Sequence, residues 1–414
     1  MNDKELYKNI LGVRSPWEVT DVKLDISNKT VTIRVEYEKE QKVCCPECSK
    51  TGTVYDHVIR RWRHLDTCQM ITMIESDVPR VSCDVHGVKQ VSVPWAESKS
   101  HFTALFEALV INWLKETSIT GVASLLRLSW DQVAGIQERA VDRGLSRREE
   151  KPLVNIAVDE TSFQKRHEYV TAIYDKDHDK VLDVLEDRKA ETLETWLKQR
   201  PKKHLDSIET VSMDMWDPFI LAVKNTIPNA TDVICFDRFH VSQHFGKAVD
   251  KVRAQEHRSF LNNNMESPLK KTKHDWLRNS SRTDNRSRRD FMILTRSTLK
   301  TARAWAIKES AAQLWDYSYR GVTENKWRQL LGWICRCRLE PVIKVGRMVK
   351  NYLWGIINAI MTRTSNAVAE SKNARIQRIK KMACGFRNRK RFRMAILFHL
   401  GGLDLMPETL GNYA

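Results

Sequence analysis

The sequence contains no run of apolar residues long enough to span a lipid bilayer, which excludes a transmembrane protein. Its first residues, Met1 to Glu5, carry charged side chains and do not resemble a secretory signal peptide. The nine cysteines show no spacing typical of a disulfide framework. A reducing compartment suits such cysteines better than an oxidising one. These absences predict a cytoplasmic protein without a membrane partner.

The chain also has fewer acidic than basic residues. The chain has 52 Asp and Glu against 69 Lys and Arg, which gives a formal net charge of +17 and a pI near 9.5. An excess of this size favours a polyanionic partner, although a basic protein of another kind would carry the same charge. With 414 residues and 42% hydrophobic content, the chain is long enough for two or three domains with cores of their own.

A β-hairpin and two metal-binding knuckles are expected near the N-terminus. Apolar residues alternate through 17–38 on either side of a turn at residues 27–29, as in two paired strands. Two Cys-x-x-Cys/His spacings follow and predict one structural zinc bound by Cys45, Cys48, Cys83 and His86. Cys44 competes with Cys45 for one of these positions.

Helical spacing begins after residue 98. The apolar residues between Phe102 and Trp113 recur every three or four positions, and two shorter helices are expected over 119–127 and 129–142. Ser129 is a good N-cap for the last of them. Three helices with a tight turn before the third are typical of a helix-turn-helix that binds DNA. An ordinary helical linker domain is the alternative.

Two strand-like segments beyond residue 152 end in acidic residues. The apolar segment 153–158 leads into Asp159, and the segment 208–213 leads into Asp214. A near-continuous apolar run is typical of a strand buried on both faces. Since charge at the end of a buried strand is costly without a partner, both carboxylates are candidates for a functional site.

The segments around these acids give an order of three strands, helix, strand, helix, strand. The expected strands are 153–160, 169–174, 181–185, 208–216 and 231–236, with helices at 189–199 and from Pro218. This order is typical of an α/β, ribonuclease-H-like fold, in which the first and fourth strands are neighbours. A basic helical region over 256–350 is expected to be inserted into that fold. Its tryptophans are expected in the hydrophobic core, with base stacking as the less favoured alternative. Residues 278–289 are expected to form a polar connection.

A third acid, Glu370, lies in a helical pattern at the head of a basic stretch. Residues 371–393 include ten Lys or Arg and no acid. Two strand-end aspartates and one helical glutamate can supply oxygen ligands for two divalent metals. Other acids compete for the three positions, namely Glu160, Asp217, Glu324 and Glu340. Asp237 also ends a strand-like segment and could join the metal site or orient His240.

Several motifs, taken together, resemble the bacterial insertion-sequence transposases of the ISL-three family. They are Cys-Pro-x-Cys at 45–48, V-D-E at 158–160, M-D-M-W-D-P-F at 213–219, F-D-R-F-H-V at 236–241, S-N-A-V-A-E-S-K-N at 365–373 and G-F-R-N-R-K-R-F-R at 385–393. The resemblance covers nearly the whole chain. His86 stands where a second Cys-x-x-Cys is usual in the family, and His binds zinc equally well.

The resemblance implies an Asp-Asp-Glu transposase whose triad is Asp159, Asp214 and Glu370. It implies two Mg²⁺ or Mn²⁺ ions at the active site, hydrolysis at the element ends and strand transfer into target DNA. Double-stranded DNA and further copies of the chain, as a homodimer or higher oligomer, are the implied partners in a bacterial nucleoid. Basic residues expected to face DNA phosphates are Lys372, Arg375, Arg378, Arg387 and Arg389.

The implied organisation has five parts. They are a zinc-binding β module over 1–96, a helix-turn-helix over 97–150, the first part of the catalytic core over 151–255, the insertion over 256–350 and the second part of the core over 351–414. Two other functions compete with transposition: a structure-selective nuclease of the same fold, and a catalytically silent DNA-binding regulator. An intact acid triad argues against the regulator, and the zinc-binding and helix-turn-helix modules argue against the nuclease.

Overall fold

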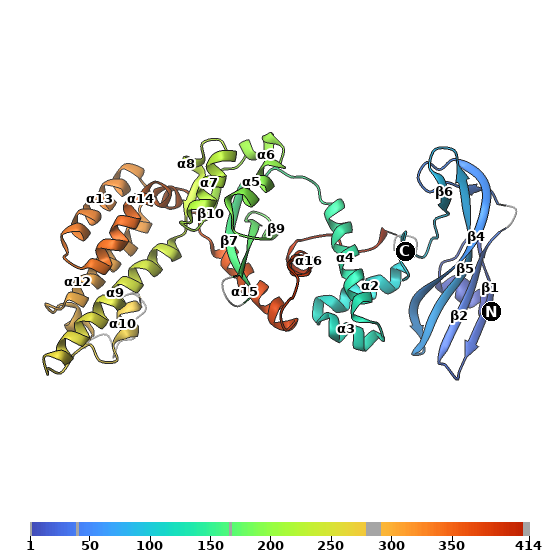
Figure 1. Cartoon of the computed structure of the whole chain (residues 1–414), viewed down its shortest axis with the longest axis horizontal. Coiled ribbons are helices and arrows are strands. Elements are labelled where there is room, and N and C mark those ends of the chain that lie inside the picture. The colour runs from blue at the N-terminus through green and yellow to red at the C-terminus, as the bar shows by residue number, and fades with distance from the viewer. Residues whose placement is uncertain (1, 39–40, 165–167, 279–290, 409–414) are drawn as a thin grey trace. The chain divides into compact units, whose positions relative to one another are not determined.

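The chain folds into two compact units that we treat separately (Figure 1). Unit 1 comprises Met1–Arg148 with Leu403–Ala414, and unit 2 comprises Glu149–Gly402. The computed structural model describes residues 2–38, 41–164, 168–278 and 291–408. The polar connection expected at 278–289 therefore lies outside the described residues, apart from its first position.

Unit 1 begins with helix α1 (Asp3–Ile10) and a six-stranded sheet. Its strands are β1 (Trp17–Asp25), β2 (Thr30–Tyr37), β3 (Val43–Cys44), β4 (Thr51–Thr67), β5 (Met70–Cys83) and β6 (Gly87–Gln90). The strand order is β1-β2-β5-β4-β3, with β6 paired to β5. The predicted hairpin is confirmed, since β1 and β2 pair antiparallel. Edge-to-face contacts join Trp17, Trp62 and Trp95 in the core of this module.

Three helices follow the sheet in unit 1: α2 (Ala104–Glu116), α3 (Ile119–Leu126) and α4 (Trp130–Ser146). Ser129 caps α4 as predicted and forms a capping box with Gln132. The turn before it contains Arg127 in the left-handed conformation, with φ of 56°. The three-helix arrangement expected from the sequence is thus present.

The segment that begins at Leu403 packs on α4, although the two are far apart in the sequence. Arg143 donates a hydrogen bond to the carbonyl of Leu405 at 2.6 Å, and Arg147 donates one to the carbonyl of Met406 at 2.6 Å. Gly144 permits this approach, because a Cβ at that position would lie 2.6 Å from the Cβ of Leu403. The helical part of unit 1 is therefore completed by residues that follow unit 2 in the chain.

Unit 2 is built on a five-stranded sheet with the order β11-β10-β7-β8-β9. The strands are β7 (Asn155–Gln164), β8 (Glu168–Asp175), β9 (Lys180–Leu185), β10 (Thr210–Met213) and β11 (Ile234–Phe236). The first and fourth strands, β7 and β10, are neighbours and parallel, as expected. The last strand is shorter than predicted, because residues 230–233 form the short helix α8 (Ala230–Val233) before it.

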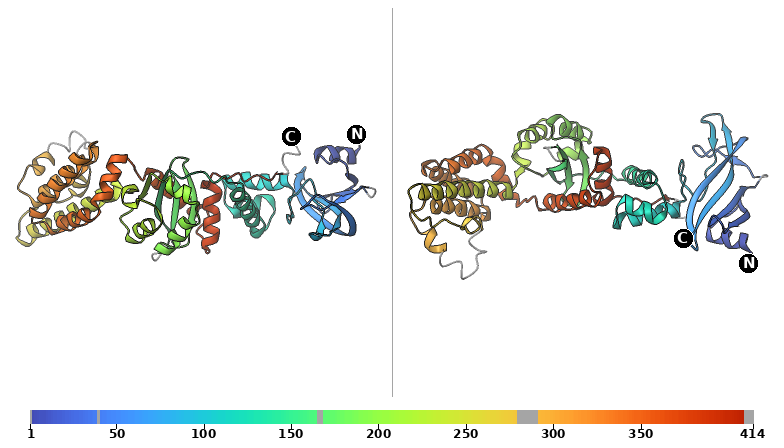
Figure 2. Two further views of the ribbon diagram at one scale, coloured as in Figure 1. Left: turned by 90° about the horizontal axis from the view of Figure 1, so that it is seen from above. Right: turned by 60° about the horizontal axis from the view of Figure 1, so that its bottom comes forward.

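Helices cover both faces of this sheet (Figure 2). On one face, α5 (Ala190–Lys198) and α7 (Asp217–Thr226) share a core with Ile156 and Val158, and α6 (Lys202–Asp206) lies between them in sequence. On the other face, α15 (Ala367–Met382) hydrogen-bonds to β7, and α16 (Arg389–Leu400) packs on β9. Alternate residues of β7 therefore point to different helices.

A helical region separates β11 from α15. Among its described residues, the α-helices are α9 (Arg238–Asn262), α10 (Lys273–Leu277), α12 (Lys300–Gln313), α13 (Arg320–Arg336) and α14 (Glu340–Thr362). Trp276 and Trp327 are fully buried, which agrees with the expectation that the tryptophans here belong to the core. Trp333 is 37% exposed. In the part of the chain that the structure describes, no helix has the length and apolar character needed to cross a membrane.

Candidate functional site

Three aspartates stand side by side where the parallel pairing of β7, β10 and β11 ends. The expected strand end at Asp159 is wrong, because β7 continues to Gln164 in its pairing with β8. Val158 of β7 pairs with Met213 of β10, which pairs with Phe236 of β11. The next residue in each chain segment is an aspartate: Asp159, Asp214 and Asp237. Since the strands run in the same direction, this common register places all three carboxylates at one edge of the sheet.

Asp159 is held in a buried, hydrogen-bonded position. It is 9% exposed, and its Oδ2 accepts a hydrogen bond of 2.7 Å from the side-chain amide of Asn373 on α15. The Asn373 oxygen accepts in turn from the hydroxyl of Tyr174, also at 2.7 Å. Burial raises the pKa of Asp159 to about 7, and the nearby charge of Asp214 adds to the effect.

Asp214 lies among other acids and beside one histidine. Nε2 of His240 is 3.0 Å from Oδ1 of Asp214, but the two are not aligned as a hydrogen bond. Among the described residues this buried oxygen has no hydrogen-bond partner. Burial raises the pKa of Asp214 to about 7, helped by the charges of Asp237, Glu160 and Glu370. The orphaned oxygen and the raised pKa both indicate a carboxylate that lacks a positive ligand.

Glu370 is brought to this edge by α15. The start of the helix is fixed because the backbone N–H of Asn366 donates to Asp237 at 3.3 Å, and its side-chain oxygen accepts from Ser212 at 3.2 Å. Further along, Gln377 donates to the hydroxyl of Thr161 at 2.9 Å, so that α15 follows β7. Burial and the charge of Asp237 raise the pKa of Glu370.

The two glutamates that compete with Glu370 belong to other surroundings. Glu324 lies 3.5 Å from Arg328 within α13, and Glu340 lies 3.8 Å from Arg347 within α14. Both are thus engaged in ion pairs on the helical region. Of the three, Glu370 is the one whose charge acts on Asp214.

The acids of unit 2 have the character of a divalent-metal site. They offer only oxygen donors, they repel one another, and one buried oxygen is unsatisfied. Hard cations such as Mg²⁺ and Mn²⁺ prefer this donor set. Among the described residues, one group of three or more potential ligands has all its ligand atoms within 4.8 Å of one another, and it is the Cys/His group of unit 1. The carboxylates of unit 2 stand farther apart than that. Mutual repulsion between unscreened carboxylates is consistent with that spacing.

The basic residues expected to face DNA differ in their surroundings. Arg375 and Arg378 are exposed on α15, and Arg387 is exposed in the loop before α16. Arg389 is half-exposed and lies 3.4 Å from Glu168. Lys372 is different, because its side chain is 4% exposed and its Nζ lies 2.8 Å from Asp179.

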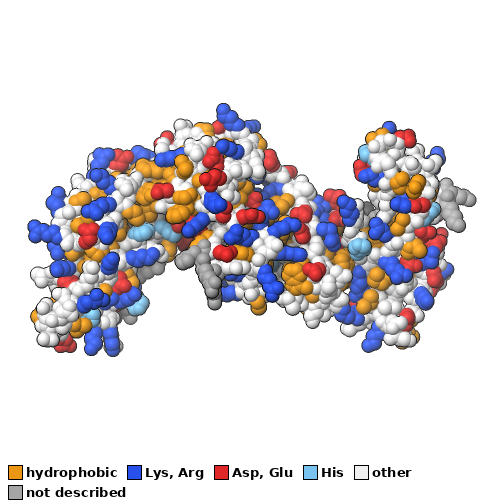
Figure 3. Space-filling model, in the orientation of Figure 1, with side chains coloured by type: hydrophobic (Ala, Val, Ile, Leu, Met, Phe, Trp, Pro, Cys, Tyr) orange, Lys and Arg blue, Asp and Glu red, His pale blue; other side chains and the backbone are white. Residues whose placement is uncertain are grey.

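Lys and Arg side chains also spread across the visible face of both units, interspersed with acids (Figure 3). The exposed arginines of α15 are therefore distinguished by their position on the helix that carries Glu370, since basic side chains are common elsewhere. The ammonium of Lys372, by contrast, is already used inside the fold.

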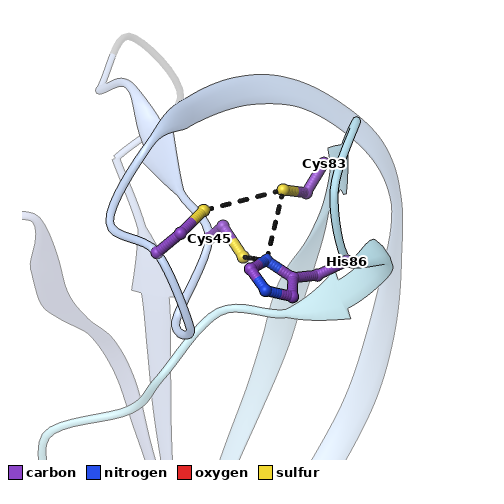
Figure 4. A group of neighbouring side chains, drawn as sticks. Cys45, Cys83 and His86 are labelled. Atoms are coloured by element: carbon purple, nitrogen blue, oxygen red, sulfur yellow. Dashed lines mark hydrogen bonds between the residues drawn. The ribbon is translucent and has the colours of Figure 1, made fainter.

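Unit 1 contains the Cys/His cluster predicted from the two knuckles (Figure 4). Three ligand pairs stand 3.7 Å apart: Cys45 Sγ with His86 Nδ1, Cys83 Sγ with His86 Nδ1, and Cys48 Sγ with Cys83 Sγ. Zinc–sulfur bonds of about 2.3 Å at tetrahedral angles give sulfur separations of about 3.8 Å. Cys44 is exposed and outside the group, which decides the alternative in favour of Cys45.

The surroundings of the cluster also suit zinc. Backbone N–H groups of His86 and Val85 lower the pKa of Cys83 to about 6, so that its thiolate forms at neutral pH. The second ring nitrogen of His86 lies 3.6 Å from the carboxylate of Glu47. A carboxylate behind a metal-binding histidine orients the ring and raises its basicity. The group therefore supports a structural zinc.

Sequence reasoning did not assign three residues that the structure brings to the acid cluster. Asp237 was considered from the sequence as a strand-end acid that could join the metal site or orient His240, but it was not placed in the triad. His240 was considered only as a partner of Asp237, and its approach to Asp214 was not predicted. Asn373 gave no signal, because its contact with Asp159 depends on how α15 lies along β7.

Comparison with known proteins agrees with this organisation. A family model described as transposase matches residues 156–396. The helix-turn-helix domain of transposase family ISL3 matches residues 91–141, and the zinc-finger of transposase IS204/IS1001/IS1096/IS1165 matches residues 41–86.

Two curated relatives extend the similarity over most of the chain. The transposase for insertion sequence element IS1557 of Mycobacterium tuberculosis is 24% identical over 94% of this chain and 93% of its own length. The transposase for insertion sequence element IS1001 of Bordetella parapertussis is 22% identical over 85% of this chain and 87% of its own length. The family model over residues 156–396 covers more than half of the chain and is accompanied by the family's zinc-finger and helix-turn-helix models, so the chain belongs to the ISL3 family of insertion-sequence transposases.

Proposed function

We propose that this chain cleaves DNA at the ends of an insertion sequence and joins those ends to target DNA, with Asp159, Asp214 and Glu370 as the catalytic acids. The observation that carries the proposal is their meeting at one sheet edge, from segments 55 and 156 positions apart in the sequence (214 − 159 and 370 − 214). The strand order of unit 2, with its first and fourth strands adjacent, supports a ribonuclease-H-like catalytic core.

Each acid would have a defined part in the reaction. Asp159 is fixed by Asn373, and Asp214 presents a carboxylate oxygen that accepts no hydrogen bond from the described residues. Glu370 projects from the helix that carries the exposed arginines Arg375 and Arg378. The three carboxylates would hold two Mg²⁺ or Mn²⁺ ions, which supply charge neutralisation at the scissile phosphate and a more acidic attacking hydroxyl.

The remaining assignments follow from the family and from the folding units. We propose that the helices of unit 1 bind the terminal inverted repeats, that a homodimer or higher oligomer acts on paired ends, and that this takes place in the bacterial nucleoid. We also propose that residues 1–96 and 97–150 act as the zinc module and the helix-turn-helix. Residues 151–255 and 351–402 would form the catalytic core around an insertion at 256–350. Residues 403–414, expected from the sequence to belong to that core, are instead part of unit 1. Of the five expected phosphate contacts, we retain Arg375, Arg378, Arg387 and Arg389, because Lys372 is paired with Asp179.

A cleavage assay on DNA carrying the element ends tests the catalytic assignment. Asp159→Asn, Asp214→Asn and Glu370→Gln should each reduce Mg²⁺-dependent cleavage by at least about a thousandfold, since charge stabilisation and positioning are lost together. Binding to the same DNA should persist. The matched controls are Glu324→Gln and Glu340→Gln, which should cut normally.

The outcome also separates the competing functions. Normal cutting by Glu370→Gln would remove Glu370 from the active site. A wild-type chain that binds ends but never cuts, with any divalent metal, would be the silent regulator. Cleavage without joining, and without preference for the element ends, would indicate the structure-selective nuclease.

A further inference from the structure

A solvent-accessible pocket of about 770 Å³ lies in unit 2 beside the acid cluster. It is formed where α5 and α7 begin, on the sheet face opposite α15. Its volume falls in the range of roughly 300–1,000 Å³ that is usual for sites binding small molecules and nucleotides. The proposed catalytic acids do not line it, so it needs a function of its own.

One arginine links the pocket to the acids. Arg188 lines the pocket, and its Nη1 lies 3.3 Å from the carboxylate of Glu160. Glu160 follows Asp159 in the chain, and its charge contributes to the raised pKa of Asp214. Trp216, also in the pocket wall, is only two residues beyond Asp214. A group bound here would therefore be next to a phosphate at the active site.

The pocket wall contains a partly exposed tryptophan ring beside an arginine. The Arg188 guanidinium lies 4.9 Å from the ring centre of Trp216 and 5.1 Å from that of Tyr169. Trp216 nevertheless remains 37% exposed, and Leu221 in the same wall is 53% exposed. Leaving an indole and a leucine in water beside a charged site costs free energy unless a flat apolar partner covers them.

The charges of the pocket limit what that partner can be. Arg188, Lys189 and Lys224 contribute three positive charges, and Glu191 and Asp217 contribute two negative ones. Asp217 accepts a hydrogen bond of 2.7 Å from the hydroxyl of Tyr352. The charges nearly balance, because Arg188 also lies 3.3 Å from Glu160 and Lys189 lies 3.8 Å from Asp187. A near-neutral wall suits one base better than a duplex backbone, which carries a charge about every 1.7 Å and would meet the acids.

We propose that this pocket binds one unpaired nucleotide next to the scissile phosphate, with its base stacked on Trp216. A base has a flat face that can cover the exposed part of the indole, and aromatic stacking tolerates any base. The base must leave the duplex to reach the pocket, and the bound state offsets part of that unstacking cost. This inference rests on the proposed function, because it assumes that DNA is cut at the acid cluster.

Photo-crosslinking tests the site without requiring any cleavage. End-containing DNA would carry 5-iodouracil at single positions on either side of the cut, and it would be irradiated with the full-length Asp159→Asn chain in EDTA. We expect one position to crosslink to the peptide that contains Trp216. Crosslinks that fall only elsewhere would overturn the proposal while leaving the proposed function intact.

A coupling experiment on the active chain gives the second test. Trp216→Ala should slow cleavage of intact DNA about 5- to 100-fold, the range of losses for one base stack. Removing the base at the crosslinking position should slow the wild type to a similar extent. Combining both changes should give no further loss, because the same contact is removed twice. Trp216→Phe should retain most of the activity, since it keeps an aromatic face.

The control is Trp333→Ala, which removes a tryptophan of the same exposure, 37%, from helix α13. It should cut intact and abasic DNA as the wild type does. The proposal would be overturned if the fold-loss in cleavage rate for both changes together equalled the product of the two separate fold-losses. A change of oligomeric state in Trp216→Ala would also overturn it. Absence of cleavage by the wild type would instead count against the proposed function, and the crosslink would still decide whether the pocket binds a base.

Discussion

The carboxylate of Asp214 shows how much the acid cluster depends on charge. Its folded-state pKa of about 7 is above the ordinary value of 3.8, and burial is the main cause. The folded chain therefore binds this proton more tightly than the unfolded chain does. Stability that is present below pH 4 is lost as the pH rises through 7.

Asp214→Asn should consequently stabilise the metal-free protein at pH 8. We expect a gain in melting temperature of about 3–6 °C in EDTA, shrinking between pH 7 and pH 4 and absent below pH 4. Thermal unfolding across this pH range is the measurement. Asp217→Asn, which changes an exposed acid three positions away, should show no such trend. An equal gain at pH 4 and pH 8 would mean that packing rather than charge is responsible.

At the level of single residues, sequence reasoning succeeded where local pattern determines position. Asp159 and Asp214 follow buried strand segments that pair in parallel, and this pairing brings them together. Asp159 does not end its strand, because β7 continues to Gln164 beside β8. The environment of Lys372 could not be foreseen, because Asp179 lies almost two hundred positions away. The pocket around Trp216 was likewise hidden, since it depends on two helices that meet only in the folded sheet.

Among the elements, the knuckles of unit 1 make a clear prediction about zinc. Cys45→Ser or Cys83→Ser should remove about one zinc per chain and unfold the β module near the tryptophan core, because metal binding and folding are coupled. Metal analysis and near-ultraviolet circular dichroism would measure the two effects. Cys44→Ser is the matched control, and it should retain the zinc because that cysteine is exposed and outside the ligand group.

Zinc loss from Cys44→Ser but not from Cys45→Ser would contradict this ligand set. A metal content far below one per chain in the purified wild type would exclude a structural zinc here altogether.

Helix α15 has two faces with different expected effects on DNA binding. Arg375 and Arg378 are exposed, whereas Asn373 and Gln377 contact β7. Replacing both arginines by Ala should weaken binding to all sequences alike and reduce the slope of log K against log salt by about 1.8, or 0.9 for each phosphate contact. Titrations at several salt concentrations would measure it.

Lys372→Met on the same helix serves as the comparison. Because its ammonium is paired with Asp179, its loss should leave the salt slope unchanged. A reduced slope for Lys372→Met, together with an unchanged slope for the double arginine variant, would reverse the assignment of the two faces.

The helix boundary that was predicted correctly has a strong cap, and the strand boundary that was predicted wrongly depends on pairing with another strand. Ser129 defines the start of α4 through its capping box, and it was found from the sequence. The stretch 231–233 was expected to be strand but is helical, because only Ile234–Phe236 finds a partner in β10. A β-rich composition does not reveal where pairing begins.

For the molecule as a whole, the segment after Gly402 joins the end of the chain to its helix-turn-helix. Deleting residues 403–414 would leave Arg143 and Arg147 without their backbone acceptors and would uncover Gly144. We expect a loss of about 1–3 kcal/mol in the stability of unit 1 and weaker end binding. Calorimetry should show a shifted transition for unit 1 and an unchanged one for unit 2.

Arg147→Ala is the milder comparison, since its partners Asp404 and Glu408 are exposed and such pairs contribute little. A deletion that shifts the transition of unit 2 instead would show that the segment belongs with the catalytic domain.

The return of this segment to α4 also orders events on the ribosome. Residues 403–408 are translated after the whole of unit 2, so a nascent chain cannot finish packing its recognition helices until the codons for all three acids have been read. A shortened product that stops within unit 2 would emerge with Gly144 uncovered and its DNA-binding helices incomplete. We expect such products to be poor competitors for the element ends, which would leave those ends to full-length copies of the enzyme.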